Sequence, residues 1–254
     1  MAVLELREVT VRFGDFAAVE GVSLSVHQGE IVGVIGPNGA GKSVTFNVAS
    51  GLQKPSDGTV RLAGKDVTRA PAHVRTAMGL GRTFQTVQLF AGMTVAENLM
   101  VAAHRHTRSG AFSDALHLPW RGRALASAAE RARAVLAFLD IEQLSGVDAM
   151  TLSVGQARLV ELGRALCLQP KVLLLDEPAS GLDPAETAAF TELLARVRSV
   201  LGCGMLVVEH DMGVVFPLCD HVVVMNFGKV LASGPPAEVR DNPAVAEAYL
   251  GATP

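Results

Sequence analysis

The sequence is poor in cysteine and has no excess of basic residues. Three cysteines stand far apart, at Cys167, Cys203 and Cys219. Their odd number and wide spacing indicate neither a disulfide framework nor a zinc site, and they favour buried thiols in a reducing compartment. The 22 basic and 25 acidic residues give a net charge of −3. This balance argues against a nucleic acid as the main partner.

Long apolar runs are missing as well. No stretch reaches the ~18 uncharged apolar residues that a membrane-spanning helix needs, and residues 1–7 lack the basic-then-apolar order of a signal peptide. We therefore expect a protein without a membrane anchor of its own, which would act at a membrane only through partner subunits. The 254 residues suffice for one large α/β domain, or for one domain with a smaller lobe.

The strongest signal lies in residues 30–43. An apolar run leads into a glycine-rich turn, and residues 36–43 fit the phosphate-loop pattern G-x-x-x-x-G-K-[ST]. Glycines let main-chain N–H groups approach oxygen atoms closely, and the following helix directs its positive end to the same place. We expect Lys42 to bind the outer phosphates and the Ser43 hydroxyl to bind magnesium. The alternative is an accidental glycine-rich turn, and the apolar helix predicted at 44–50 argues against it.

Apolar patterns predict the framework around this loop. Residues 3–26 alternate apolar and polar side chains, which predicts two antiparallel strands joined at Gly14 and Asp15, and residues 59–63 add another strand. Uninterrupted apolar runs are typical of parallel strands buried on both faces. Two occur at 172–175 and 205–208, and a third predicted strand, 221–225, begins with His221 and continues as an apolar run. The predicted fold class is α/β, with a phosphate-binding core beside an antiparallel β layer.

The character of the sequence changes between the core segments. Residues 88–157 have a mostly helical pattern, with a looser polar part at 104–123. We expect this segment to form an inserted helical lobe, and the alternative is that its helices cover the sheet. The nucleotide-binding core would then comprise residues 1–87 and 158–235, followed by a helical tail at 236–254.

Polar side chains stand at the ends of the predicted parallel strands. Asp176 and Glu177 follow one apolar run, and His210 follows another. Open α/β sheets bind ligands beyond the carboxyl ends of their strands, so we expect these groups to lie near the phosphate loop. Asp176 would hold Mg²⁺, directly or through water, and Glu177 would polarise an attacking water. A solvated strand end and a structural histidine are the simpler alternatives.

A second anion-receptive helix start is predicted at residues 152–156. Ser153 suits an N-cap, and Gly155 permits a close approach to the backbone. One active site needs only one such cradle. The second cradle suggests that two copies face each other and that each supplies its helix start to the other's nucleotide. An ordinary helix start is the alternative.

These motifs occur in the order typical of an ABC-transporter ATPase subunit, which the chain resembles over nearly its whole length. They lie at 36–43, Gln85, 152–156, 172–177, 180–183 and His210. The resemblance implies an ATP hydrolase with a P-loop NTPase (RecA-like) core and an inserted helical lobe. It also implies a head-to-tail dimer that holds two ATP molecules between phosphate loop and signature motif, with ATP and Mg²⁺ as cofactors.

The resemblance implies roles for single residues. Gln85 would sense magnesium and the membrane subunit, and Asp183 would cross the dimer interface. Phe13 falls where the family has an aromatic side chain stacked on adenine, with a core phenylalanine as the alternative. The implied catalytic residues are Lys42, Gln85, Glu177 and His210. Of these, His210 would contact the γ-phosphate. The implied magnesium ligands are Ser43, Gln85 and Asp176. The implied nucleotide-binding residues are Phe13, Gly36, Pro37, Asn38, Gly39, Ala40, Gly41, Lys42, Ser43, Val44, Ser153, Gly155, Gln156 and Asp183.

Finer features are similar to the subfamily that serves importers of branched-chain and other hydrophobic amino acids. They are the segments 81–85, 89–90, 93–95 and 97–99, a long polar insert before the signature motif and a short C-terminal tail. Val154 replaces the middle glycine that is common in the signature motif. That position varies in this subfamily, so we expect activity to survive.

The expected partners follow from the resemblance. They are a second cassette, identical or paralogous, integral-membrane permease subunits and, indirectly, a solute-binding protein, all at the cytoplasmic face of the cell membrane; no nucleic acid is expected. A cassette for lipopolysaccharide or lipid export and a soluble ABC protein acting on ribosomes or DNA stay open as alternatives. A non-catalytic nucleotide sensor is a third, against which Lys42, Asp176, Glu177 and His210 argue. The sequence does not predict the solute, because this subunit would not contact it.

Overall fold

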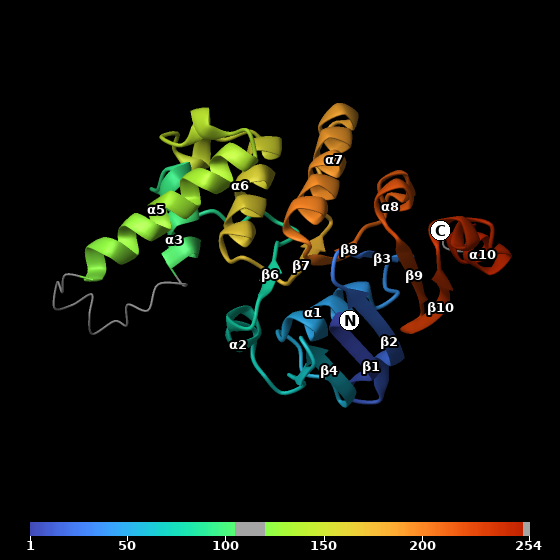
Figure 1. Ribbon diagram of the computed structural model, residues 1–254. Helices are drawn as coiled ribbons and strands as arrows, with labels where there is room; N and C mark the ends of the chain where they lie inside the picture. Colours follow the sequence, from blue (N-terminus) through green and yellow to red (C-terminus); the bar gives the residue numbers. More distant parts are fainter. Residues whose placement is uncertain (105–119, 251–254) are drawn as a thin grey trace. The chain divides into compact units, whose positions relative to one another are not determined.

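Two β-sheets form the framework of the computed structural model, which describes residues 1–104 and 120–250 (Figure 1). The first sheet has the strand order β2-β1-β4-β5 and is antiparallel. Its strands are β1 (Ala2–Phe13), β2 (Phe16–His27), β4 (Asp57–Leu62) and β5 (Lys65–Asp66). The predicted antiparallel layer is therefore present, with β1 and β2 joined at Gly14 and Asp15.

The second sheet has the strand order β10-β9-β3-β8-β7-β6. Neighbours from β9 to β6 are parallel, and only β10 pairs antiparallel with β9. Its strands are β3 (Ile31–Ile35), β6 (Leu80–Arg82), β7 (Val172–Asp176), β8 (Gly204–Val208), β9 (His221–Asn226) and β10 (Lys229–Gly234). β3 and β8 are buried along their whole length, as expected for strands covered on both faces.

Helices alternate with these strands along much of the chain. The α-helices are α1 (Lys42–Ser50), α2 (Ala72–Ala77), α3 (Val95–Ala103), α5 (Trp120–Phe138), α6 (Val154–Cys167), α7 (Pro184–Leu201), α8 (Met212–Leu218), α9 (Pro236–Arg240) and α10 (Pro243–Leu250). Short 3₁₀ helices lie at η2 (Glu142–Leu144) and η3 (Ala149–Thr151). In the part of the chain that the structure describes, none of these helices has the length and apolar character to cross a membrane.

One hydrophobic core holds the two sheets and α1 together. It contains Leu6 and Val22 from the antiparallel sheet, Val34 and Leu174 from the parallel sheet, and Phe46 from α1, all fully or almost fully buried. Burial of each such side chain is worth about 1.5–3 kcal/mol relative to exposure. This shared core fixes α1, and with it the glycine-rich turn that precedes it, beyond the carboxyl end of β3.

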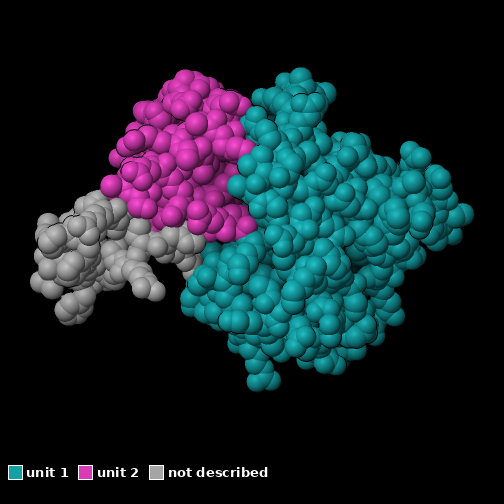
Figure 2. Space-filling model, in the orientation of Figure 1, with its two compact units in different colours: residues 1–85, 171–254 teal, residues 86–170 magenta. Residues whose placement is uncertain are grey.

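The contacts divide the chain into two compact units, which Figure 2 colours separately. Unit 1 comprises residues 1–85 and 171–254, and unit 2 comprises residues 86–170. The sequence placed the end of the helical lobe at residue 157, which is too early. α6 belongs to unit 2 because its inner face packs there: a Cβ built on Gly163 would lie 3.0 Å from Leu139 Cδ1 and 3.4 Å from Leu99 Cδ2.

Other boundaries also differ from the sequence predictions. β4 begins at Asp57, before the predicted residue 59, because Asp57 pairs with Thr10 of β1. β10 and α7 were not predicted. The predicted tail is helical through Leu250, as α9 and α10, and most of the polar part predicted at 104–123 lies outside the described residues.

The three cysteines are free and buried, as their spacing indicated. Burial raises the pKa of the Cys167 and Cys219 thiols to about 12 and raises that of Cys203 as well. The thiols are therefore protonated at neutral pH.

Candidate active site

The glycine-rich turn after β3 forms a phosphate-sized cradle. Gly36, Gly39 and Gly41 have φ angles of 149°, 78° and 96°, in the region that favours glycine. Gly41 is the N-cap of α1, and no side chain caps this helix. Helix N-termini of this kind present N–H groups and a partial positive charge to an anion. The local backbone thus has the form that the sequence pattern predicts.

Alanine substitutions in this turn should separate two effects, the backbone strain of a positive φ angle and the steric overlap of an added Cβ atom. A Cβ on Gly36 would lie 2.1 Å from the Met225 carbonyl oxygen, whereas one on Gly39 would meet nothing within 4 Å. We expect Gly36→Ala to lose roughly 3 kcal/mol or more of unfolding free energy, from strain and overpacking together. Gly39→Ala should lose about 1 kcal/mol, from strain alone. Urea denaturation of the nucleotide-free proteins measures both, and equal losses would contradict this account.

Lys42 lies folded over its own loop. Its side chain is buried, and Nζ donates hydrogen bonds to the carbonyl oxygens of Gly36, at 2.6 Å, and Pro37, at 2.9 Å. Burial lowers the pKa of Lys42, and the negative charge of Glu177 partly offsets this. The Lys42 ammonium therefore lies in the electrostatic field of Glu177, beside the cradle.

Glu177 is the point where the predicted polar residues meet. Gln85 Nε2 donates to Glu177 Oε2 at 3.0 Å, and His210 Nδ1 lies 4.0 Å from Glu177 Oε1. Three elements supply these groups: Gln85 follows β6, Glu177 follows β7 and His210 follows β8. Their approach is a direct result of the parallel order β8-β7-β6.

The backbone at Glu177 is strained. Its φ angle is 44°, although it is not a glycine, and its N–H donates to the Val208 carbonyl oxygen at 2.8 Å. Such a conformation costs on the order of 1–3 kcal/mol and persists where surrounding contacts enforce it, typically at functional sites. The turn directs the Glu177 carboxylate to Gln85 and His210. This strain was not predicted, because a glutamate rarely adopts a positive φ angle.

Glu209 is a structural member of the site that the sequence did not single out. It is 1% exposed and accepts hydrogen bonds from the backbone N–H of Ala179, at 3.0 Å, and of His210, at 3.1 Å. Its Oε2 also lies 3.7 Å from His210 Nδ1. This one carboxylate ties the loop after β7 to the loop after β8. Its position at the end of an apolar run, immediately before His210, is the sequence feature from which its place in the site could have been predicted.

Asp176 ends β7, and the Arg82 guanidinium lies beside its carboxylate. Arg82 Nη2 is 3.5 Å from Asp176 Oδ2, and both side chains are 13% exposed. Ser43 is exposed at the first turn of α1. Ser43, Asp176 and Gln85 together offer hydroxyl, carboxylate and amide oxygens, the donors that magnesium prefers. Within residues 1–104 and 120–250, no cluster of three or more His, Cys, Asp or Glu side chains is placed to hold a metal ion.

Three further predicted residues have distinct surroundings. Phe13, at the hairpin end of β1, is 54% exposed, so the alternative of a core phenylalanine is wrong. Val44 is half-buried in α1. Asp183 is the N-cap of α7, and its carboxylate accepts from the Glu186 N–H at 2.8 Å.

Unit 2 carries the second predicted helix start. Ser153 is the N-cap of α6, as the sequence indicated, and forms a capping box with Gln156: Oγ of Ser153 accepts from the Gln156 N–H, and Oε1 of Gln156 accepts from the Ser153 N–H. Gly155 lies in the first turn and Val154 is 54% exposed. The start of α6 is thus presented on the surface of its own unit.

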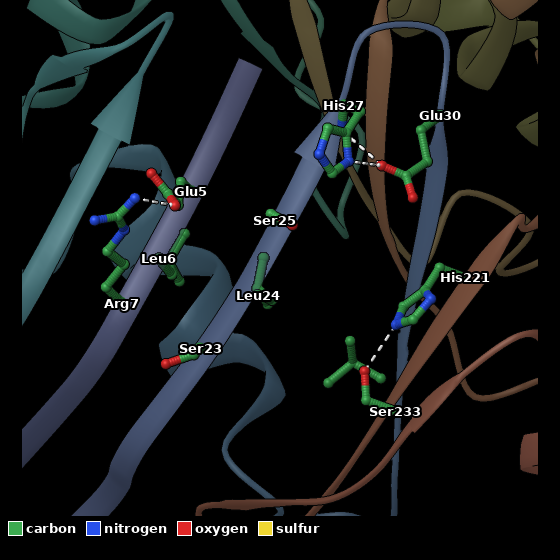
Figure 3. Close-up of a pocket in the computed structure, with 11 residues that line it drawn as sticks. Glu5, Leu6, Arg7, Ser23, Leu24, Ser25, His27, Glu30, His221 and Ser233 are labelled. Atoms are coloured by element: carbon green, nitrogen blue, oxygen red, sulfur yellow. Dashed lines mark hydrogen bonds and ion pairs between the residues drawn. The ribbon is translucent and has the colours of Figure 1, made fainter. Parts of the chain in front are cut away.

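Unit 1 has cavities both beside the phosphate loop and away from it. The first, about 670 Å³, borders the phosphate loop at residues 37–40 and is also lined by Asn226, Phe227, Leu231 and residues of α10. The second, about 390 Å³, contains none of the predicted site residues (Figure 3). Its polar groups pair with one another, as Arg7–Glu5, His27–Glu30 and His221–Ser233. It adjoins the amino ends of β3 and β9, whereas Glu177 follows a carboxyl end.

Sequence comparisons place these motifs in a known group. Residues 19–180 match the family model described as ABC transporter, and residues 229–253 match the model described as branched-chain amino acid ATP-binding cassette transporter. The high-affinity branched-chain amino acid transport ATP-binding protein BraF of Pseudomonas aeruginosa is 42% identical over 98% of each chain. The lipopolysaccharide export system ATP-binding protein LptB of Acidithiobacillus ferridurans is 36% identical over 92% of this chain and 90% of its own.

Solved structures agree in fold. The ADP conformation of MJ1267, an ATP-binding cassette of an ABC transporter, has a TM-score of 0.84 and 33% identity, covering 99% of each chain. A dimeric ATP-binding cassette, MJ0796, bound to ADP and Pi has a TM-score of 0.76 and 25% identity, covering 92% of this chain and 98% of that one. The α/β fold class predicted from the sequence is confirmed.

Proposed function

Since the chain belongs to the ABC transporter family of ATP-binding cassettes, we propose that it is the ATP-binding and ATP-hydrolysing subunit of an importer for branched-chain or other hydrophobic amino acids. The solute class is supported by the 42% identity with BraF over nearly the full length and by the match of residues 229–253 to the branched-chain amino acid model. The lower identity with LptB gives less support to the lipopolysaccharide export alternative.

The observation that carries the hydrolytic role is the meeting of Gln85 and His210 at the Glu177 carboxylate. In the proposed mechanism, the N–H groups of residues 36–43 and the Lys42 ammonium bind the β- and γ-phosphates. Glu177 accepts a proton from the attacking water, and Gln85 orients that water and the carboxylate. His210 donates to the γ-phosphate, where negative charge increases in the transition state.

Magnesium completes the proposed site. Ser43, Asp176 and Gln85 would hold the ion, and the bound ion would neutralise charge on the β- and γ-phosphate oxygens. Phe13 would stack on the adenine; its 54% exposure leaves the ring accessible for this contact.

The proposed assembly is a head-to-tail dimer in which the start of α6, with Ser153, Gly155 and Gln156, faces the nucleotide of the other copy. Asp183 would lie at the same interface. The second cassette would be identical or paralogous, and the dimer would work with permease subunits at the cytoplasmic face of the membrane, indirectly with a solute-binding protein. Solved ABC cassettes that resemble this chain include a dimer bound to ADP and Pi, which supports this arrangement.

Reconstitution tests the proposal. The chain is co-purified with its membrane partners, placed in liposomes that enclose Mg²⁺ and ATP, and supplied with the solute-binding protein and labelled leucine. We expect ATP-dependent uptake that excess isoleucine or valine suppresses. ATP turnover without uptake of any branched-chain amino acid, but with release of a glycolipid from the membrane, would instead favour an exporter.

A further inference from the structure

Arg82, the last residue of β6, has a mostly buried guanidinium that contacts groups from two other elements. Its Nη1 donates to Asn47 Oδ1 at 3.0 Å and to Ser50 Oγ at 2.5 Å, both on α1. Its Nη2 forms the 3.5 Å ion pair with Asp176 at the end of β7. One side chain therefore connects the helix of the phosphate loop to the acidic strand end.

Two aromatic rings enclose the same guanidinium. Arg82 Cζ lies 4.7 Å from the ring centroid of Phe46 and 5.2 Å from that of Phe84. Both distances are within the range of cation–π attraction. Phe84 immediately precedes Gln85 in the chain. The packing of the Phe84 ring therefore influences the position of the Gln85 backbone, from which the Gln85 side chain extends.

Placing the Arg82 charge in this mostly buried site costs free energy, because the guanidinium loses contact with water. Arg82 Nε is buried and has no hydrogen-bond partner in the described chain. Burying a charge or leaving a buried donor without a partner costs free energy unless other contacts compensate. The hydrogen bonds to α1, the ion pair with Asp176 and the two rings are the contacts that offset this cost.

We propose that Arg82 is a positioning residue for magnesium, which sets the places of Ser43 through α1, of Asp176 directly and of Gln85 through Phe84. This inference rests on the proposed function, in which these three side chains hold the ion. Magnesium demands near-ideal octahedral geometry, so small displacements of its ligands weaken binding strongly. The guanidinium is planar, so it can donate hydrogen bonds in its plane and contact aromatic rings with its faces. A lysine ammonium cannot make this combination of contacts.

The test compares Arg82→Met, Arg82→Lys and the wild type. Loss of an outer partner of metal ligands typically costs about 10–100-fold in metal affinity. We expect Arg82→Met to raise the Mg²⁺ concentration for half-maximal ATP turnover by about tenfold, and Arg82→Lys by a smaller factor. Calorimetric titration supplies a readout apart from turnover: the gain in ATP affinity caused by Mg²⁺ should shrink, whereas affinity for ATP in EDTA should change by less than about twofold.

Controls separate the possible failures. Arg7→Met makes the same chemical change at an exposed arginine, whose side chain is 58% exposed, and should leave both readouts as in the wild type. If Arg82→Met does not fold, Phe84→Leu removes one ring and should still raise the Mg²⁺ requirement. Wild-type Mg²⁺ dependence in all the Arg82 and Phe84 variants, or an equal loss of affinity with and without Mg²⁺, would overturn the inference. A wild-type protein without Mg²⁺-dependent turnover would instead refute the proposed function.

Discussion

Replacement of Glu177 by glutamine should lower ATP turnover by roughly 10²–10³-fold, the scale of loss for a removed catalytic group. Glutamine keeps the size of the side chain and a hydrogen-bonding oxygen for Gln85 Nε2, which lies 3.0 Å from the carboxylate. It removes the negative charge that would take a proton from water. The phosphate loop is unchanged, so equilibrium binding of ATP should be kept. Phosphate release in the steady state and ATP titration measure the two effects.

Glu192→Gln is the matched control. Glu192 is exposed on α7, and the same substitution there should leave turnover as in the wild type. If Glu177→Gln hydrolysed ATP at the wild-type rate, another group would have to accept the proton, and the proposed role of Glu177 would be wrong.

Replacement of Lys42 by methionine should weaken ATP binding strongly. Lys42 is the buried cation of the phosphate loop, with Nζ within 2.6–2.9 Å of the Gly36 and Pro37 carbonyl oxygens. Methionine has a similar length and no charge. Each charge-assisted hydrogen bond to a phosphate is worth about 1.5–3 kcal/mol, so the loss of two should raise the Kd for ATP by about 10²-fold or more. Turnover should fall at least in proportion.

Lys54→Met separates this effect from a general loss of positive charge. Lys54 is exposed in the turn before β4, and its replacement should leave ATP affinity unchanged. Urea denaturation of both nucleotide-free variants establishes that they are folded. Wild-type ATP affinity in folded Lys42→Met would show that the cradle binds phosphate without this side chain.

The features that the sequence predicted are those encoded by short segments. The phosphate loop follows from eight consecutive residues, and β7, β8 and β9 follow from apolar runs. Because these strands are parallel, their carboxyl ends lie at the same edge of the sheet, and this placed Glu177 and His210 at one edge. The capping box at Ser153 was also local, since its two partners are three residues apart.

The features that it missed depend on residues far apart in the chain. Arg82 meets Asp176 only because β6 and β7 are neighbours in the sheet, although unit 2 lies between them in sequence. The positive φ of Glu177 is enforced by its surroundings rather than by its residue type. Along most of β10, exposed residues alternate with residues that are only partly buried. A strand at the edge of a sheet with this pattern has a weak apolar alternation, so the sequence hardly indicates it.

The buried, protonated cysteines have a practical consequence. Thiolates react with maleimides and thiols hardly do, so the raised pKa values of Cys167, Cys203 and Cys219 protect the native side chains from labelling. A single cysteine introduced at an exposed position, such as Phe227, which is 88% exposed, would then carry a fluorophore or spin label without prior removal of the native thiols. Distance measurements between labels on two copies could follow their approach and separation through a cycle of nucleotide turnover.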